Sequence, residues 1–119
     1  MEDLTFKKIE QSIQDRKNLH LKFLEHVKTY KPFLELEQKA FGDGALEKKT
    51  KELMALSISI VTKCEPCMEW HLDQAMQARA TDEEIYETID VAIEMGGGQA
   101  GAYARFVLKP MEYFKTRDE

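Results

Sequence analysis

Residues 51–98 read KELMALSISIVTKCEPCMEWHLDQAMQARATDEEIYETIDVAIEMGGG, and this stretch decides the fold. Leu56 and Ile60 follow Leu53 by three and seven positions, which is the spacing of one helix face. The TDEE sequence at 81–84 is a capping box, in which a threonine begins a helix and a glutamate follows three residues later. No part shows the sustained alternation of a half-buried strand. The stretch therefore predicts consecutive helices.

The rest of the chain continues this helical pattern. We expect helices over about 3–30, 32–41, 46–62, 65–78, 81–95 and 99–108, and a further turn over 111–115. Pro32 suits the first turn of a helix, and the Gly-Asp-Gly sequence at 42–44 and the three glycines at 96–98 mark breaks. Pro110 should end or kink the last helix. The sequence predicts an all-α fold of about six helices, in a single domain over residues 1–119.

Composition and charge limit the possible partners. Hydrophobic residues make up 43% and charged residues 33% of the chain, as in ordinary soluble globular proteins. The net charge of -5 and the lack of a basic run with interleaved aromatics argue against a nucleic-acid partner. The charged N-terminal segment does not resemble a secretory signal, and no apolar run is long enough for a membrane span. We therefore expect a cytoplasmic protein with no membrane partner.

Four residues, Glu52, Cys64, Cys67 and His71, form the pattern E-x11-C-x2-C-x3-H. The cysteines are the only two in the chain and lie within disulfide reach. In a reducing compartment, such a pair is more often catalytic or metal-binding than structural. Both fall at the start of a helix, where the helix dipole and free N–H groups favour a thiolate. The pattern predicts thiol–disulfide chemistry.

Each of the four residues can be given a role. His71 lies one helical turn after Cys67, so it can accept the proton of that thiol, and we assign the attack on the substrate to Cys67. Cys64 would then either attack the oxidised Cys67 to form a disulfide or be the first sulfur to react with the incoming reductant. A tight turn after Thr62 would run the flanking helices antiparallel and bring Glu52 alongside His71 or Cys67. There the carboxylate would accept a proton directly or through a water.

Two structural interpretations of the same residues stay open. Free cysteines are often buried, so the pair could be ordinary core residues. Cysteine, histidine and glutamate also bind zinc, but a proline between the cysteines and a carboxylate within a helix fit a structural zinc site poorly. We therefore expect neither a metal nor a cofactor. His20 and His26 should be surface or packing residues of the first helix.

Residues 51–98 resemble the carboxymuconolactone decarboxylase superfamily, and within it the AhpD-like alkylhydroperoxidase branch. Glu52, Cys64, Cys67 and His71 stand at the spacing of that family. The segment AMQARATDEEI is similar to the helix–turn–helix that follows the family's active site. The resemblance implies an all-α fold in which a helical hairpin carries the site. It also implies a homo-oligomer, commonly a trimer or hexamer.

The resemblance further implies an oxidoreductase of antioxidant defence, a thiol-dependent peroxidase or disulfide reductase. Its substrate would be a hydroperoxide or the disulfide of a peroxiredoxin-type partner, and its reductant a dithiol such as a lipoyl-linked one. Cys67 would correspond to the reactive cysteine and Cys64 to its disulfide partner, with His71 and Glu52 as the proton relay. This chain departs from the AhpD-like pattern at Pro66, where those proteins carry a further histidine of the relay.

Two other functions stay open. A lyase of the γ-carboxymuconolactone decarboxylase type would not use the cysteine pair, and it would need a basic residue to hold a substrate carboxylate. Arg79 and Arg105 are weak candidates for that residue. A redox-sensing or structural oligomer without enzymatic activity would form the disulfide without turnover.

Overall fold

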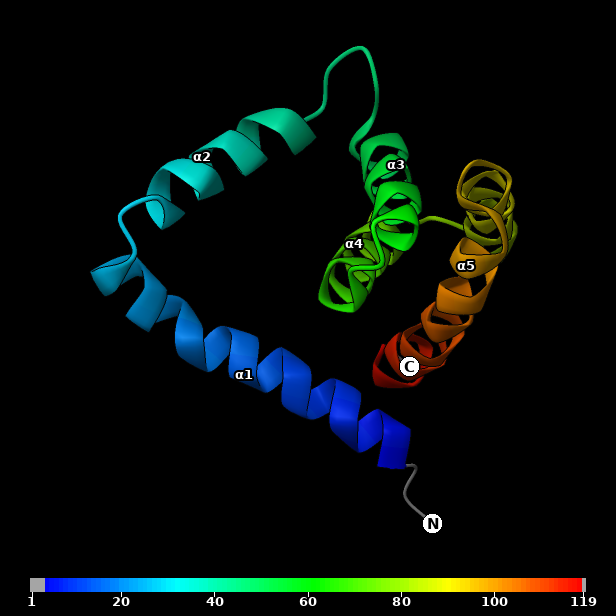
Figure 1. The fold of residues 1–119 in the computed structure, drawn as a ribbon. Coiled ribbons are helices and arrows are strands. Elements are labelled where there is room, and N and C mark those ends of the chain that lie inside the picture. Colours follow the sequence, from blue (N-terminus) through cyan, green and yellow to red (C-terminus); the bar gives the residue numbers. More distant parts are fainter. Residues whose placement is uncertain (1–3, 119) are drawn as a thin grey trace. The chain divides into compact units, whose positions relative to one another are not determined.

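The computed structural model describes residues 4–118 of the 119-residue chain, and every regular element in that range is a helix. Figure 1 shows the five helices, which are α1 (Leu4–His26), α2 (Tyr30–Phe41), α3 (Lys48–Val61), α4 (Glu65–Gln77) and α5 (Asp82–Arg117). None of the helices in this range is long and apolar enough to cross a membrane. The prediction of an all-α fold is confirmed.

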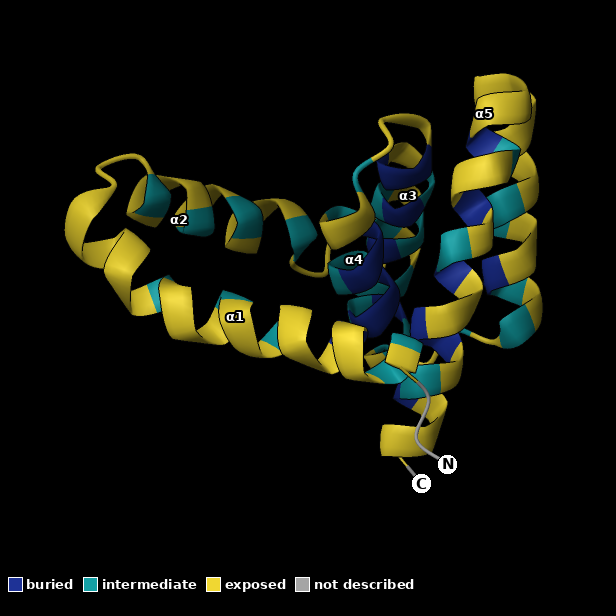
Figure 2. Cartoon of the chain, turned by 60° about the horizontal axis from the view of Figure 1, so that its bottom comes forward, coloured by how far each residue is buried: buried dark blue, intermediate teal, exposed yellow. Residues whose placement is uncertain are grey.

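The chain divides into two compact units, residues 1–42 and residues 43–119. The first unit is a hairpin of α1 and α2, in which Tyr30 contacts two residues of α1. Its hydroxyl lies 2.7 Å from Nδ1 of His20, and its ring packs edge-on against Phe23. No residue of α2 is buried, as the colours of Figure 2 show. The single domain over residues 1–119 stays a prediction.

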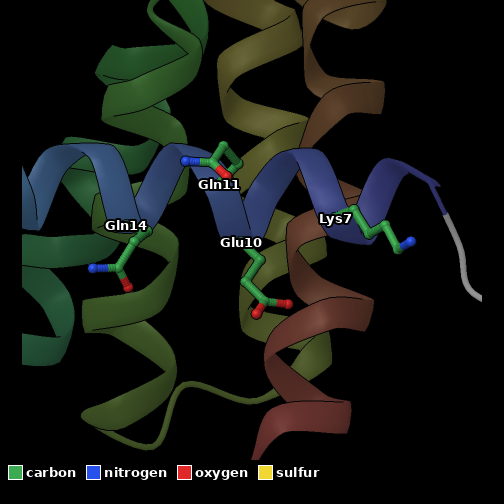
Figure 3. A pocket seen from close by; sticks show the side chains of 4 residues that line it. All are labelled: Lys7, Glu10, Gln11 and Gln14. Atoms are coloured by element: carbon green, nitrogen blue, oxygen red, sulfur yellow. The ribbon is translucent and has the colours of Figure 1, made fainter.

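A hollow along α1 has a polar lining. Figure 3 shows four side chains that line it and come from successive turns of α1, namely Lys7, Glu10, Gln11 and Gln14. These side chains supply neither a thiol nor an imidazole. The residues of the predicted thiol chemistry, Glu52, Cys64, Cys67 and His71, all lie in the second unit.

The second unit packs α3, α4 and α5 against one another. Leu56 and Ile60 of α3 are fully buried, as are Met68 and Leu72 of α4. Each pair is four positions apart, so both members lie on one helix face. Leu53, which was predicted to share this face of α3, is only half-buried. The inner face of α5 contributes further buried apolar residues, which are Ile85, Ala92, Ala100, Ala104, Val107, Met111 and Phe114.

A short turn joins α3 to α4. Thr62 is the C-cap of α3, Lys63 adopts the left-handed conformation with φ 60°, and Cys64 is the N-cap of α4. The N–H of Cys64 donates to the carbonyl of Ser59 at 3.0 Å, which ties the turn back to α3. Pro66 lies in the first turn of α4, where its missing N–H costs no intrahelical hydrogen bond. The tight turn predicted after Thr62 is present.

Helix α5 consists of two arms joined at a glycine. Gly97, with φ 75° and ψ -160°, is the one residue inside α5 with non-helical angles. An ion pair between Asp82 and Lys115 links the beginning of the first arm to the end of the second. The helices predicted over 81–95 and 99–108 are these two arms. The break expected at the glycines is present at Gly97, and with both arms counted as α5 the described residues form five helices rather than about six.

Pro110 was predicted to end or kink the last helix, and it does not end it, because α5 continues to Arg117 and includes the turn expected over 111–115. Pro110 is buried, and so are Met111 and Phe114 after it. Burial of these apolar side chains offsets the hydrogen bond that a proline removes from a helix. In the last turn, Arg117 pairs with Asp73 of α4 at 2.9 Å and stacks on the Phe114 ring.

Candidate active site

Cys64 and Cys67 form a disulfide at the N-terminus of α4. Their Sγ atoms are 2.02 Å apart and their Cα atoms 5.2 Å apart. Cys64 is the N-cap, and its sulfur accepts a hydrogen bond from the backbone N–H of Cys67 at 3.3 Å. Both side chains are half-buried. The sulfurs therefore lie where the dipole and N–H groups of α4 favour negative charge.

Glu52 of α3 and His71 of α4 form a hydrogen-bonded pair. Glu52 Oε1 lies 2.8 Å from His71 Nδ1, and the side chains are 3% and 16% exposed. The turn after Thr62 folds α4 back along α3, which brings together two residues that are 19 positions apart. A buried carboxylate needs hydrogen-bond partners, and His71 supplies one of them. The structure thus joins the glutamate to the histidine, the first of the two partners considered for it.

The sequence reasoning missed Lys48, which also binds Glu52. Its Nζ donates to Oε2 of Glu52 at 3.1 Å and to Oε1 of Gln74 at 3.0 Å. Lys48 precedes Glu52 by four positions on α3, a spacing that favours such pairs and is visible in the sequence. Lys49 and Lys51 offer the same charge nearby, and only the packing of α3 on α4 shows which lysine reaches the carboxylate.

The partners of Glu52 indicate which ring nitrogen of His71 carries a proton. One carboxylate oxygen accepts from the Lys48 ammonium and the other lies against Nδ1 of His71. With Glu52 as a carboxylate, the Nδ1–H of His71 is the donor of the 2.8 Å hydrogen bond. An oriented imidazole therefore lies on α4 one turn after Cys67.

The other residues considered from the sequence lie apart from these contacts. Arg79 and Arg105 are exposed, and Arg79 adopts the left-handed conformation in the turn after α4. His20 packs on Tyr30 within the first unit, and His26 is exposed on α1. Within residues 4–118, no three side chains of His, Cys, Asp or Glu are arranged to hold a metal ion.

Comparisons with known proteins agree on one family. The sequence profile of the carboxymuconolactone decarboxylase family matches residues 28–110. A Paracoccus denitrificans protein, "Uncharacterized protein 4 in cox locus", is 44% identical over 80 residues, which cover 67% of this chain and 72% of that protein.

Solved structures of the family are also similar. A carboxymuconolactone decarboxylase family protein from Legionella pneumophila has a TM-score of 0.84 at 36% identity, over 90% of this chain and 96% of that one. A family member from Thermotoga maritima, for which a role in the antioxidative response has been suggested, has a TM-score of 0.79 at 32% identity. That match covers 92% of this chain and 97% of the Thermotoga chain. The present chain belongs to the carboxymuconolactone decarboxylase family.

Proposed function

We propose that this chain is a thiol-dependent peroxidase or disulfide reductase of the AhpD-like type. One observation carries the proposal: the Cys64–Cys67 pair at the N-terminus of α4 is followed, one turn later, by a histidine held by a buried glutamate. That combination provides a nucleophile, a resolving thiol and a proton acceptor. The antioxidative role suggested for the Thermotoga relative supports a function in antioxidant defence.

The proposed cycle starts from the two free thiols. His71 accepts the proton of Cys67 on Nε2, while its Nδ1–H stays bonded to Glu52. The Cys67 thiolate attacks the terminal oxygen of a hydroperoxide, the O–O bond breaks, and the leaving alkoxide takes the proton to become an alcohol. Cys67 is then a sulfenic acid. The Cys64 thiol attacks that sulfur, which forms the disulfide and releases water.

An external dithiol closes the cycle. One of its thiolates attacks the Cys64–Cys67 disulfide, and its second thiol completes the exchange, so that the dithiol becomes a disulfide and both cysteines are reduced. A lipoyl-linked dithiol fits this chemistry. A peroxiredoxin-type disulfide is the alternative substrate, in which case Cys67 attacks one of its sulfurs and Cys64 releases the product.

A homo-oligomer, a trimer or hexamer in the cytoplasm, is part of the proposal. Exposed apolar side chains of the second unit support it. Met54 and Ile58 of α3 and Val91 of α5 line a largely apolar groove between these helices. Clustered exposed apolar side chains mark surfaces that bind other proteins.

A free-thiol count by mass spectrometry tests the proposal. The reduced protein is treated with one equivalent of an organic hydroperoxide and then with reduced lipoamide. We expect both thiols to be lost to an internal Cys64–Cys67 disulfide and to return with the dithiol. Persistence of both thiols with the hydroperoxide and with a peroxiredoxin disulfide would overturn the proposal and favour the decarboxylase or structural interpretation.

A further inference from the structure

We propose that Lys48 is a positioning residue of this site, which holds the Glu52 carboxylate against Nδ1 of His71 and thereby fixes the tautomer of the imidazole. The role in catalysis rests on the proposed function. The effect of Lys48 on the tautomer of His71 does not, so the two can be tested separately.

The Lys48 ammonium lies between α3 and α4. It donates to Glu52 Oε2 at 3.1 Å within α3 and to Gln74 Oε1 at 3.0 Å across to α4. The Lys48 side chain is 40% exposed and that of Glu52 only 3%. The cation can therefore stay hydrated on one side while it offsets the cost of burying the carboxylate on the other. Gln74, three positions after His71, fixes the ammonium against the same helix that carries the imidazole.

Other carboxylates on α4 and α5 that could compete with Glu52 for the Lys48 ammonium pair with other cations or lie on another face of their helix. On α4, Asp73 pairs with Arg117 of α5 at 2.9 Å. Glu69 is two positions before His71, and residues two apart on a helix do not share a face.

From α5, the first turn reaches α3 through Glu84, which pairs with Lys49 at 2.9 Å. Asp82, in the same turn, pairs with Lys115 in the other arm. The structure thus gives Glu52 two polar partners, Lys48 on α3 and His71 on α4.

Loss of the ammonium would release the Glu52 side chain. Without Lys48, Oε2 of Glu52 would lie buried without its donor, and the carboxylate would no longer be held from two sides. The Nδ1–H of His71 would then lose its fixed acceptor, and the neutral ring could carry its proton on either nitrogen. A ring with its proton on Nε2 could not accept the proton of Cys67. Lys48 therefore keeps the imidazole in the form that the proton relay needs.

The test compares Lys48→Met with Lys49→Met. Both variants remove one positive charge from α3, but Lys49 pairs with Glu84 and not with Glu52. In the reduced proteins, the rate of disulfide formation with an organic hydroperoxide is measured at pH 7. We expect Lys48→Met to lower this rate by about 10-fold, part of the help that a general base gives, and Lys49→Met to match the wild type. Lys48→Arg should restore the wild-type rate, and Gln74→Leu should give a smaller loss.

A second readout does not depend on turnover. Ring nitrogen NMR of reduced protein labelled at histidine reports which nitrogen of His71 carries the proton. At a pH where the ring is neutral, we expect Nδ1–H in the wild type and a mixture of the Nδ1–H and Nε2–H forms in Lys48→Met. Identical ring nitrogen signals in the two proteins would overturn the inference, as would an equal change in Lys49→Met. If the NMR change appears but no variant consumes hydroperoxide, the positioning role stands and the proposed peroxidase function fails.

Discussion

At the residue scale, the two cysteines have different surroundings. Cys64 is the N-cap of α4, whereas Cys67 lies one turn before His71. We predict that Cys64→Ser still reacts once with hydroperoxide and stops at a sulfenic acid, because only Cys67 is left to attack. Intact-mass spectrometry should show a gain of about one oxygen. Cys67→Ser should not react, and the reverse pattern would exchange the two roles.

His71 allows a direct test of thiol activation. We predict that His71→Ala slows alkylation of Cys67 by iodoacetamide at neutral pH by about 100-fold, the usual scale of general-base help. The variant is made in the Cys64→Ser background so that one thiol is counted. The control, His26→Ala, changes an exposed histidine of α1 and should leave the rate as it is. Equal rates in the two variants would remove His71 from the relay.

The contacts of Glu52 show how much of the site the sequence can predict. The chain reverses direction between the glutamate and the cysteines of the pattern E-x11-C-x2-C-x3-H. Once the turn after Thr62 is known to be short, the approach of Glu52 to His71 follows. The link from Lys48 to Gln74 joins two helices at positions that no local pattern relates. Such a contact depends on the rotation of α4 against α3, which side-chain packing determines.

At the element scale, the reversal within α5 depends on one backbone conformation. Gly97 has φ 75° and ψ -160°, a combination that is open to glycine and strained for other residues. We predict that Gly97→Ala lowers the free energy of unfolding by about 1–3 kcal/mol. Urea unfolding followed by circular dichroism measures it.

The neighbouring glycine is the matched control for this prediction. Gly98 has no positive φ, and a Cβ there would meet no atom within 4 Å. Alanine is favoured over glycine inside a helix by about 1 kcal/mol, so Gly98→Ala should keep or raise the stability. An equal loss in both variants would mean that the substitutions act through something other than the Gly97 conformation.

The ends of the helices show where local signals are sufficient. Thr81 and Glu84 form both hydrogen bonds of the predicted capping box, so the start of α5 was readable from four residues. Pro110 was expected to end or kink the last helix because proline locally breaks a helix. The helix continues through it because Met111 and Phe114 are buried in the second unit. Sequence periodicity does not give the packing that decides between these effects.

At the scale of the whole molecule, apolar groups on the surface support the proposed self-association. Ile58 is 61% exposed in the groove between α3 and α5. We predict that Ile58→Glu shifts the chain to a smaller species in sedimentation velocity, because a charge would be buried in the subunit contact. Leu108→Glu changes an exposed apolar residue outside the groove and is the control. An unchanged assembly in both variants would exclude the groove from the contact.

Stability of the whole chain should depend on pH through Glu84. The backbone N–H of Thr81, and then the ammonium of Lys49, hold the pKa of Glu84 below its ordinary value of 4.5. A carboxyl whose pKa is lower in the folded state stabilises the fold fully above the unfolded pKa. That contribution is lost as the pH falls through the folded pKa. Acid therefore weakens both the start of α5 and its ion pair with α3.

The variant Glu84→Gln isolates this charge, since glutamine can still complete a capping box. We predict that its melting temperature is lower than that of the wild type at pH 7, and that the difference shrinks as the pH falls below about 4.5. Glu87→Gln, at an exposed position of the same helix, is the control. A difference that stays constant from pH 7 to pH 3 would mean that Glu84 stabilises the fold through hydrogen bonding and packing alone, without its charge.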